Sequence, residues 1–142
     1  GMVRVDDRDV AHRVFKALQM ARNVFYLQEF VPHENQDIRA FVIGDKVVAS
    51  MLRLGESWKT NIARGAKAKP YRLSPELEES CVKASKVVGC DYAGVDILQS
   101  EEDGRFFVTE VNSTPGWEGL QTVTKTNIAD SLTKYIIEAC SK

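Results

Sequence analysis

Three side chains with oxygen donors, Asp96, Glu110 and Asn112, stand in apolar stretches of the sequence where they could bind a cation. Asp96 interrupts the strand-like run at 92–98, and an ionised carboxylate is costly to bury there unless it is paired or coordinates a metal. Glu110 and Asn112 are two residues apart, so they share one face if the next apolar stretch is also a strand. Pairing of the two strands through the loop at 100–104 would bring the three donors together. Hard oxygen donors with no His or Cys nearby suit Mg²⁺ or Mn²⁺ better than zinc.

The same three residues could instead be the solvent-facing polar positions of an antiparallel hairpin, because alternating polar residues are typical of a half-exposed sheet. Two features favour the metal site. Asp is disfavoured inside strands, and Asn112 leads into the Ser-Thr-Pro-Gly sequence at 113–116, a rigid turn that could hold this end of the site in place.

A second group of candidate residues lies in the segment 55–73, which loses hydrophobic periodicity and is predicted to be a long loop. Asn61 and Arg64 could bind anionic groups there, and Gly65 would let the backbone approach a ligand. A solvated basic loop is the alternative interpretation.

Two further groups could line the same site. Asp37 and Arg39 are two residues apart on a predicted strand and face the same way, although a surface ion pair is the alternative. The residues at 28–30, Gln28, Glu29 and Phe30, end an apolar stretch and could offer backbone groups to a flat heterocycle beside an aromatic wall. Packing at the end of a strand is the alternative for these three.

The elements that must position these residues follow from hydrophobic spacing, caps and turns. Gly44 marks a hairpin turn between two strand-like runs, Ser74 caps a helix that Gly89 ends, and Asn127 caps the final helix. The predicted helices cover 7–22, 75–88 and 128–139, and the predicted strands cover 24–31, 37–43, 47–54, 92–98 and the stretch around 110–112.

The composition predicts one soluble globular domain over residues 1–142. The chain is 44% hydrophobic and has a formal net charge of -1, which argues against a nucleic-acid-binding protein with a broad basic surface. No apolar run is long enough to span a bilayer and no secretory leader is recognisable, so we expect a cytoplasmic protein without a membrane partner. The cysteines include no CxxC pair and indicate neither a disulfide framework nor a zinc site.

Five short motifs, taken in order, resemble the ATP-grasp ligases of the RimK-like α-L-glutamate ligase group. They are found at 28–30, 37–39, 60–65, 95–97 and 110–116, and they read QEF, DIR, TNIARG, VDI and EVNSTPG. The match extends over most of the chain in both order and spacing.

The resemblance implies an α+β fold, the C-terminal ATP-grasp lobe, with a mostly antiparallel sheet and helices packed on one side of it. It implies that this lobe follows an N-terminal domain and a first lobe with a glycine-rich loop, neither of which can be placed in residues 1–142. The implied enzyme is an ATP-dependent ligase that uses Mg²⁺, or Mn²⁺, and joins L-glutamate to a carboxylate acceptor through an acylphosphate. Acceptors in the group are a ribosomal protein C-terminus, tetrahydromethanopterin, a deazaflavin coenzyme and an amino-group carrier protein. We expect the chain alone to be inactive, and members of the group commonly form homo-oligomers.

The resemblance also implies roles by position. Mg²⁺ would be held by Asp96, Glu110 and Asn112. The nucleotide-binding residues would be Gln28, Glu29 and Phe30 at the adenine, together with Asp37, Lys59, Thr60 and Asn61. The catalytic residues, which would contact phosphate or substrate carboxylate groups, would be Arg39, Asn61 and Arg64. Lys59 stands where some members have Arg, which weakens the case for a bidentate contact at that position.

A different class of function is a noncatalytic nucleotide-binding or interaction module that keeps the fold. A third interpretation is a chain that folds but binds no nucleotide alone. A glycine-rich loop and a nucleotide-binding Lys encoded upstream of Gly1 would favour the ligase.

Overall fold

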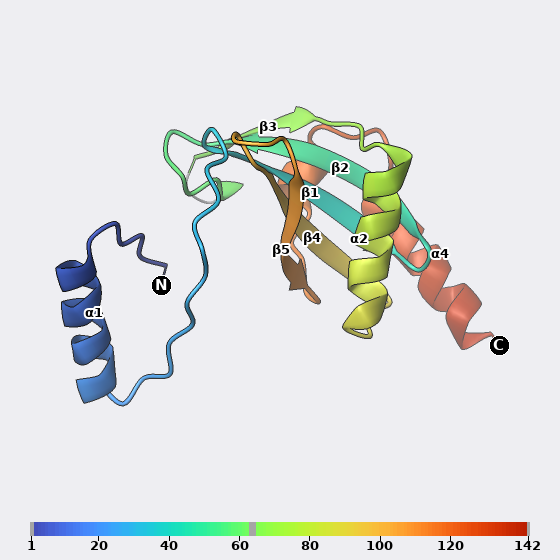
Figure 1. Ribbon diagram of the computed structural model, residues 1–142. Helices are drawn as coiled ribbons and strands as arrows, with labels where there is room; N and C mark the ends of the chain where they lie inside the picture. Colours follow the sequence, from blue (N-terminus) through green and yellow to red (C-terminus); the bar gives the residue numbers. More distant parts are fainter. Residues whose placement is uncertain (1, 63–64, 142) are drawn as a thin grey trace. The chain divides into compact units, whose positions relative to one another are not determined.

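The computed structural model describes residues 2–62 and 65–141, which fall into two compact units, Gly1–Val31 and Pro32–Lys142 (Figure 1). The first unit is small, and the second contains the whole sheet. None of the helices in the described residues is both long and apolar enough to cross a lipid bilayer.

The first unit consists of one helix and an irregular segment. Helix α1 (Arg8–Met20) begins where the Asp7 carboxylate accepts hydrogen bonds from two backbone N–H groups of the first turn. Phe15 on the helix stacks on Phe25 of the segment, with ring centroids 5.2 Å apart. The predicted helix is therefore confirmed, with slightly narrower bounds.

The strand predicted over 24–31 is wrong, because this stretch forms no regular secondary structure. Its β-branched and aromatic residues have the right propensity, but a strand needs a neighbouring edge to bond its backbone, and no strand lies within residues 2–31. Val24, Tyr26 and Leu27 are exposed here. The β-forming residues of this segment are therefore not enough to make it a strand when no neighbouring strand is present to bond its backbone.

The second unit is built on a five-stranded antiparallel sheet in the order β3-β2-β1-β4-β5. The β1–β2 and β4–β5 hairpins confirm the predicted pairings, and Gly44 adopts the positive φ of 58° expected at the first turn. The long loop predicted over 55–73 is wrong in part, because its second half contains a short strand that pairs with β2. The strands are β1 (Gln36–Ile43), β2 (Lys46–Leu54), β3 (Lys67–Pro70), β4 (Tyr92–Gln99) and β5 (Phe106–Asn112).

One face of the sheet packs against helix α2 (Pro75–Val87). The helix begins at Ser74, as predicted, where the hydroxyl accepts a hydrogen bond from the N–H of Leu77. Burial raises the pKa of the Cys81 thiol on this helix to about 11, so it is unreactive at neutral pH. The core on this face contains Leu77 and Cys81 with Ile38, Ala40, Val42, Val95 and Ile97.

The opposite face is covered at one end by two helices, α3 (Glu118–Gln121) and α4 (Ile128–Cys140). Asn127 caps α4, as predicted, by accepting a hydrogen bond from the N–H of Asp130. The core on this face contains Leu120 and Ile128 from the helical side with Phe41, Ile43 and Met51 from the sheet.

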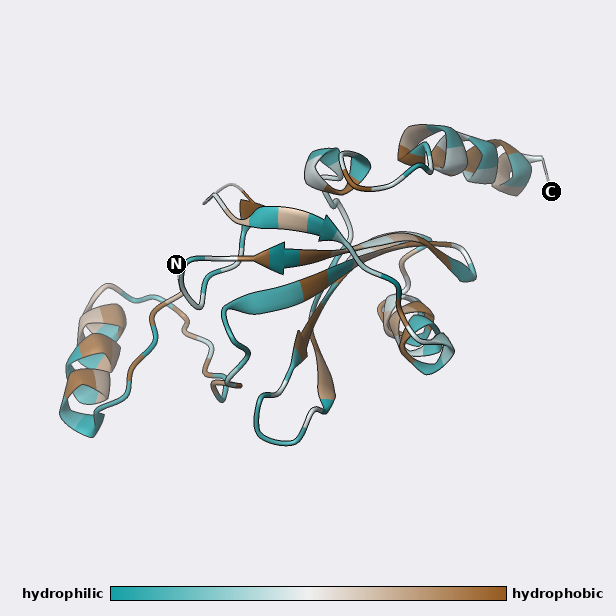
Figure 2. Ribbon diagram, turned by 90° about the horizontal axis from the view of Figure 1, so that it is seen from above, coloured by the Kyte–Doolittle hydropathy of each residue, from teal (hydrophilic) through white to brown (hydrophobic). Residues whose placement is uncertain are grey.

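The α+β fold class and the antiparallel sheet are confirmed, but the helices do not all pack on one side. Figure 2 shows α2 on one side of the strands and α3 and α4 on the other. The reason lies in β1, where the four residues from Ala40 to Ile43 are all buried. A strand that is apolar on both faces needs a packed layer on each.

Helix α4 contacts the β1–β2 turn through Tyr135. The Tyr135 hydroxyl donates a hydrogen bond of 3.1 Å to Asp91 Oδ1, and the backbone N–H of Gly44 donates one of 2.7 Å to the carbonyl oxygen of Asp91. A Cβ at Gly44 would lie 2.7 Å from Cε2 of Tyr135. The turn, the start of β4 and the helix therefore form one packed junction.

We predict that Gly44→Ala destabilises the protein more than Gly104→Ala. Both glycines have a positive φ, 58° and 70°, so each alanine introduces about 1 to 2 kcal/mol of backbone strain. Only the alanine at 44 also meets the Tyr135 ring, since the nearest atom to a Cβ at 104 is Nε2 of Gln99 at 3.9 Å. Urea denaturation followed by far-UV circular dichroism measures both variants. Equal losses of unfolding free energy would mean that Tyr135 moves aside without cost.

Candidate functional site

Four charged side chains lie together on the sheet face that carries α3 and α4, beyond the part that these helices pack on. They are Asp37 and Arg39 on β1, Arg53 on β2 and Asp96 on β4, and we call them the charged cluster. The register pairs Asp37 with Arg53 and Arg39 with Asp96, and directly opposite residues share a face. Phe41, two residues after Arg39, packs against the helical side on the same face.

Arg53 is the centre of the charged cluster. Its Nε donates a hydrogen bond of 2.6 Å to Asp37 Oδ1, its Nη2 bonds to the other oxygen of Asp37, and the same Nη2 lies 3.0 Å from Asp96 Oδ2. Arg39 Nη2 donates a hydrogen bond of 3.0 Å to Asp96 Oδ2. Asp37, Arg53 and Asp96 are only 8%, 4% and 7% exposed, so they compensate one another's charge in place of water.

Burial and charge act in opposite directions on the pKa values of the charged cluster. Burial raises the pKa of Asp96 above its ordinary value, while Arg53 and Arg39 act to lower it. Burial acts to lower the pKa of Arg53, but the hydrogen bond and charge of Asp37 and the charge of Asp96 outweigh it, so this pKa is raised. Arg53 is therefore a permanent cation, and Asp96 is the group whose ionisation the protein opposes.

The β4–β5 hairpin brings the three predicted metal donors to the same face as the charged cluster. Glu110 lies opposite Asp96, and Asn112 lies opposite Gly94. The Glu110 side chain is exposed. Asn112 Oδ1 accepts a hydrogen bond of 2.9 Å from the N–H of Thr114, which ties this donor to the turn that follows it, as the sequence indicates.

A β-bulge interrupts the pairing of β4 and β5 directly after Asp96. The next residue, Ile97, lies opposite Val108, which leaves Thr109 as the extra residue of β5. The Thr109 hydroxyl donates a hydrogen bond of 3.3 Å to the carbonyl oxygen of Asp96. The bulge lets Glu110 share the face of Asp96 while Val108 shares the face of Ile97.

The donors present on this face fit a divalent cation. Oδ1 of Asp96 is buried and accepts no hydrogen bond, although Nε of Arg39 forms an ion pair with it at 2.5 Å. Asp37, Asp96 and Glu110 face two guanidinium groups, which leaves one negative charge. Residues 2–62 and 65–141 contain no group of three His, Cys, Asp or Glu that could hold a metal, so the predicted site requires Asn112 as a donor. Metal binding by these residues stays a prediction.

The predicted anion-binding loop follows β2 directly and begins two residues after Arg53. It turns tightly at Gly55, where a Cβ would lie 2.9 Å from the carbonyl oxygen of Ser57. Thr60 is buried and Asn61 is exposed. The Lys59 ammonium lies 4.8 Å from the centroid of the Trp58 ring.

The far end of this loop packs against helix α3. A Cβ at Gly119 would lie 3.2 Å from Cγ1 of Ile62, so the two elements approach closely. Arg64, predicted to be catalytic, lies outside the described residues. The binding roles predicted for Lys59, Thr60 and Asn61 stay predictions.

The three residues predicted to contact adenine lie in the first unit. The side chains of Gln28, Glu29 and Phe30 are all exposed. The guanidinium of Arg4, in the same unit, lies 3.9 Å from the centroid of the Phe30 ring. Their contact with a nucleotide stays a prediction.

Arg53 is the residue of the charged cluster that sequence reasoning missed. Its signal is a cation inside the apolar run of β2, between Leu52 and Leu54, which is as unusual as Asp96 inside β4. A buried carboxylate predicted on one strand calls for a buried cation from another strand of the sheet, and Arg53 supplies it from β2.

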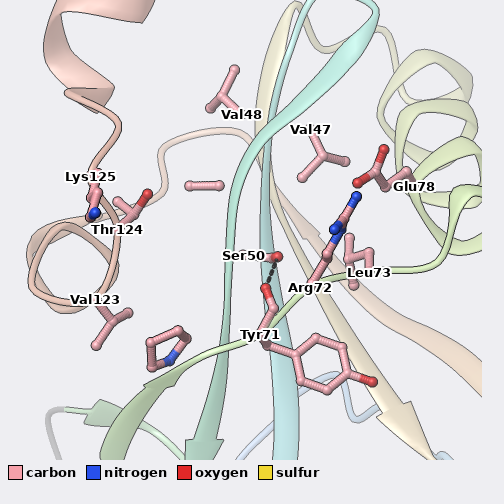
Figure 3. Close-up of a pocket in the computed structure, with 12 residues that line it drawn as sticks. Val47, Val48, Ser50, Tyr71, Arg72, Leu73, Glu78, Val123, Thr124 and Lys125 are labelled. Atoms are coloured by element: carbon pink, nitrogen blue, oxygen red, sulfur yellow. Dashed lines mark hydrogen bonds between the residues drawn. The ribbon is translucent and has the colours of Figure 1, made fainter.

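A hollow of about 470 Å³ lies along the first half of β2, at the other end of the strand from Arg53 (Figure 3). Val47 and Ser50 line it from the strand, and the Ser50 hydroxyl donates a hydrogen bond of 2.6 Å to the carbonyl oxygen of Tyr71. Arg72 and Lys125 are among its charged lining residues. None of the predicted site residues lines this hollow, so the candidate site is the charged cluster and its neighbours.

Comparison with protein families gives one match that covers nearly the whole chain. Residues 1–136 match the family described as the RimK-like ATP-grasp domain. A tetrahydromethanopterin:alpha-L-glutamate ligase from Methanocaldococcus jannaschii is 46% identical over 120 residues, which are 82% of this chain and 40% of that protein. A probable alpha-L-glutamate ligase from Cellvibrio japonicus is 39% identical over 141 residues, which are 97% of this chain and 46% of that protein. The chain therefore spans less than half the length of these relatives.

Solved structures share the fold. The ATP-grasp ligase PsnB, in complex with a phosphomimetic variant of its minimal precursor, Mg and ADP, matches with a TM-score of 0.64 and 28% identity. The match covers 81% of this chain and 35% of PsnB. The D-alanine–D-alanine ligase of Bacillus anthracis in complex with ATP matches with a TM-score of 0.60 and 19% identity, over 93% of this chain and 46% of that chain, which shows a common fold.

We predict that Arg53→Met destabilises the protein by about 3 to 5 kcal/mol at pH 7, because it leaves Asp37 and Asp96 buried without a central partner. The loss should be smaller at pH 4. The folded-state pKa of Asp96 is already raised above the ordinary 3.8, and removing Arg53 raises it further, so its ionisation costs more stability as the pH rises through this range.

Urea denaturation at pH 4 and pH 7 measures this effect. Arg105→Met is the matched control, since Arg105 forms an exposed ion pair with Asp103 and its loss should change stability little at either pH. If Arg53→Met lowers the free energy of unfolding equally at both pH values, the ionisation of Asp96 is not the main cause of the destabilisation.

Proposed function

Because this chain belongs to the family of RimK-like ATP-grasp domains, we propose that it is the C-terminal lobe of an ATP-dependent ligase that joins L-glutamate to an acceptor. The observation that carries the proposal is the set of oxygen donors Asp96, Glu110 and Asn112 beside two arginines on one face of the sheet. A metal-bound phosphate needs both kinds of group, oxygen donors for the metal and cations for the phosphate oxygens.

Mg²⁺ would be held by Asp96, Glu110 and Asn112, with Mn²⁺ as a substitute, and when bound it would neutralise charge that develops on the phosphate oxygens. Both carboxylate oxygens of Asp37 bond to Arg53. We therefore infer that Asp37 serves the nucleotide site by positioning Arg53. Oδ1 of Asp96 is buried and accepts no hydrogen bond, which supports its role as a donor.

The proposed reaction has two steps. A carboxylate oxygen of the acceptor attacks the γ-phosphorus of ATP, and ADP leaves, which gives an acylphosphate. The amine of L-glutamate then attacks the acyl carbon, phosphate leaves with the bonding electrons, and the amine loses a proton. Arg39 and Arg64 would hold the phosphate oxygens, and Asn61 would orient the substrate. No nucleophilic Ser or Cys is required.

The remaining predicted residues would bind the nucleotide itself. The adenine would lie against Phe30, with Gln28 and Glu29 beside it. Lys59 and Thr60 would contact the nucleotide from the loop after β2. The structural neighbour PsnB, which is 28% identical, supports a nucleotide as ligand, because it is in complex with ADP and Mg.

The names of the relatives suggest which acceptor to try first. Since one relative is a tetrahydromethanopterin:alpha-L-glutamate ligase, we propose a coenzyme acceptor of this kind as the first candidate. A deazaflavin coenzyme, a carrier protein and the C-terminus of a ribosomal protein are the alternatives. Peptide acceptors also have support, because PsnB is in complex with its precursor peptide. A cytoplasmic location and a homo-oligomeric state are part of the same proposal.

We predict that Asp96→Asn and Glu110→Gln each lower ADP formation about 100-fold or more, because each removes a metal donor that stabilises the transferring phosphate. The measurement is ADP release by a longer protein that contains this chain, with L-glutamate, Mg²⁺, ATP and each candidate acceptor. Glu102→Gln, in the exposed loop after β4, is the matched control and should leave the rate unchanged.

Full activity in Asp96→Asn would overturn the assignment of the metal site. Magnesium-dependent nucleotide binding by the longer protein without ADP formation on any acceptor would instead favour a noncatalytic nucleotide-binding or interaction module.

A further inference from the structure

Gly94 is the third residue of β4, at a position where any side chain would collide with the charged cluster. In the sheet register it is opposite Phe41 on one side and Asn112 on the other. A Cβ at this position would overlap the guanidinium of Arg39 and would lie 2.8 Å from Cβ of Pro115. The backbone of Gly94 therefore forms the surface over which the Arg39 side chain extends.

This surface determines where the Arg39 charge lies. Arg39 starts on β1 opposite Asp96, and its guanidinium reaches over Gly94, the residue that pairs with Asn112. From there Nη2 donates to Oδ2 of Asp96, and Nε pairs with Oδ1. The cation of Arg39 thus lies at one proposed metal donor, Asp96, and over the residue that pairs with another, Asn112.

Charge compensation of the buried aspartates does not depend on Arg39 alone. Arg53 bonds to both oxygens of Asp37 and also pairs with Asp96. Arg39 adds a second positive charge at Asp96, and a divalent cation that approaches the same carboxylate meets repulsion from it. Arg39 is also the more exposed of the two, with 13% of its side chain accessible against 5% for Arg53, so it is the cation nearer to solvent.

Resting on the proposed function, we propose that Arg39, positioned by Gly94, is an internal counter-ion of Asp96 that a divalent cation must displace. Gly94 is then a positioning residue, since it acts only through Arg39. The counter-ion keeps Asp96 compensated before the metal binds and lowers the affinity of the site for metal alone.

The test is a titration of the 142-residue chain with Mn²⁺, in which the free ion is measured by electron paramagnetic resonance. Arg39→Gln should bind Mn²⁺ about tenfold more tightly than the unsubstituted chain, because one positive charge close to the ion is gone. Arg105→Gln removes the same charge from an exposed ion pair with Asp103 and should leave the affinity unchanged. Asp96→Asn should abolish the binding in either background, which assigns the signal to this site.

The role of Gly94 has its own pair of variants. Gly94→Ala should shift the Mn²⁺ affinity toward that of Arg39→Gln, and the double variant should bind no more tightly than Arg39→Gln alone. Gly104→Ala is the control for replacing a glycine, because Gly104 lies in the loop after β4 and the nearest atom to its Cβ would be Nε2 of Gln99 at 3.9 Å, so it should leave the Mn²⁺ affinity unchanged. Circular dichroism establishes that each variant is folded.

The outcomes separate this inference from the function on which it rests. If Mn²⁺ binding depends on Asp96 but is unchanged or weaker in Arg39→Gln, the counter-ion proposal is wrong and the metal site stands. If the effects of Gly94→Ala and Arg39→Gln on the Mn²⁺ affinity are additive in the double variant, Gly94 does not act through Arg39. If no Asp96-dependent binding occurs in any variant, the proposed metal site fails, and the counter-ion proposal fails with it.

Discussion

The ion pairs of Arg53 with Asp37 and Asp96 are the constraint on which the rest of the sheet depends. Two buried carboxylates on different strands are tolerable only with a cation between them, and Arg53 supplies it from a third strand. A slip of one residue in β2 would turn Arg53 toward the apolar core under α2, which would leave Asp37 without its bonds to Arg53 and Asp96 with Arg39 as its remaining cation. The charged cluster thus specifies the register of three strands, although it need not add net stability.

The sheet face that carries the charged cluster is divided along its length. At one end Phe41, Ile43 and Met51 are covered by residues of α3 and α4, and at the other end the strands carry charge. The alternation along β1 makes this division possible, because the residue type on one face changes from charged to apolar between Arg39 and Phe41 while the other face is apolar from Ile38 to Val42. Apolar packing therefore holds the strands rigid next to the groups that we propose bind a ligand.

Local signals were enough to predict part of the fold. The cap at Ser74, the turn at Gly44 and the cap at Asn127 each act within a few residues, and the structure has all three. The parts that failed depend on neighbours distant in the sequence. The stretch at 24–31 has no strand to pair with among residues 2–31, and Lys67–Pro70 is a strand only because the edge of β2 is available.

The candidate site also has one part that could be predicted from local sequence and another that depends on residues distant in the sequence. The β4–β5 hairpin could be predicted, so Asp96, Glu110 and Asn112 could be placed on one face from the sequence alone. The partners of Asp96 could not, because they come from β1 and β2, and strand order does not follow from local pattern. For the same reason the role of Arg53 could not be predicted. The contact of Gly94 with Arg39 could not be predicted either, because it depends on how the Arg39 side chain crosses from the neighbouring strand.

The bulge at Thr109 has a consequence for how this hairpin can vary among related sequences. It divides β5 into two segments, and the alternation of side chains between the two faces is offset by one position from one segment to the other. In one segment Glu110 lies opposite Asp96, and in the other Val108 lies opposite Ile97. An insertion or deletion in the loop at 100–104 would disturb the segment nearer the loop first and would reach Glu110 only if the bulge were lost. The bulge therefore separates changes in the length of this loop from the geometry of the pair of carboxylates.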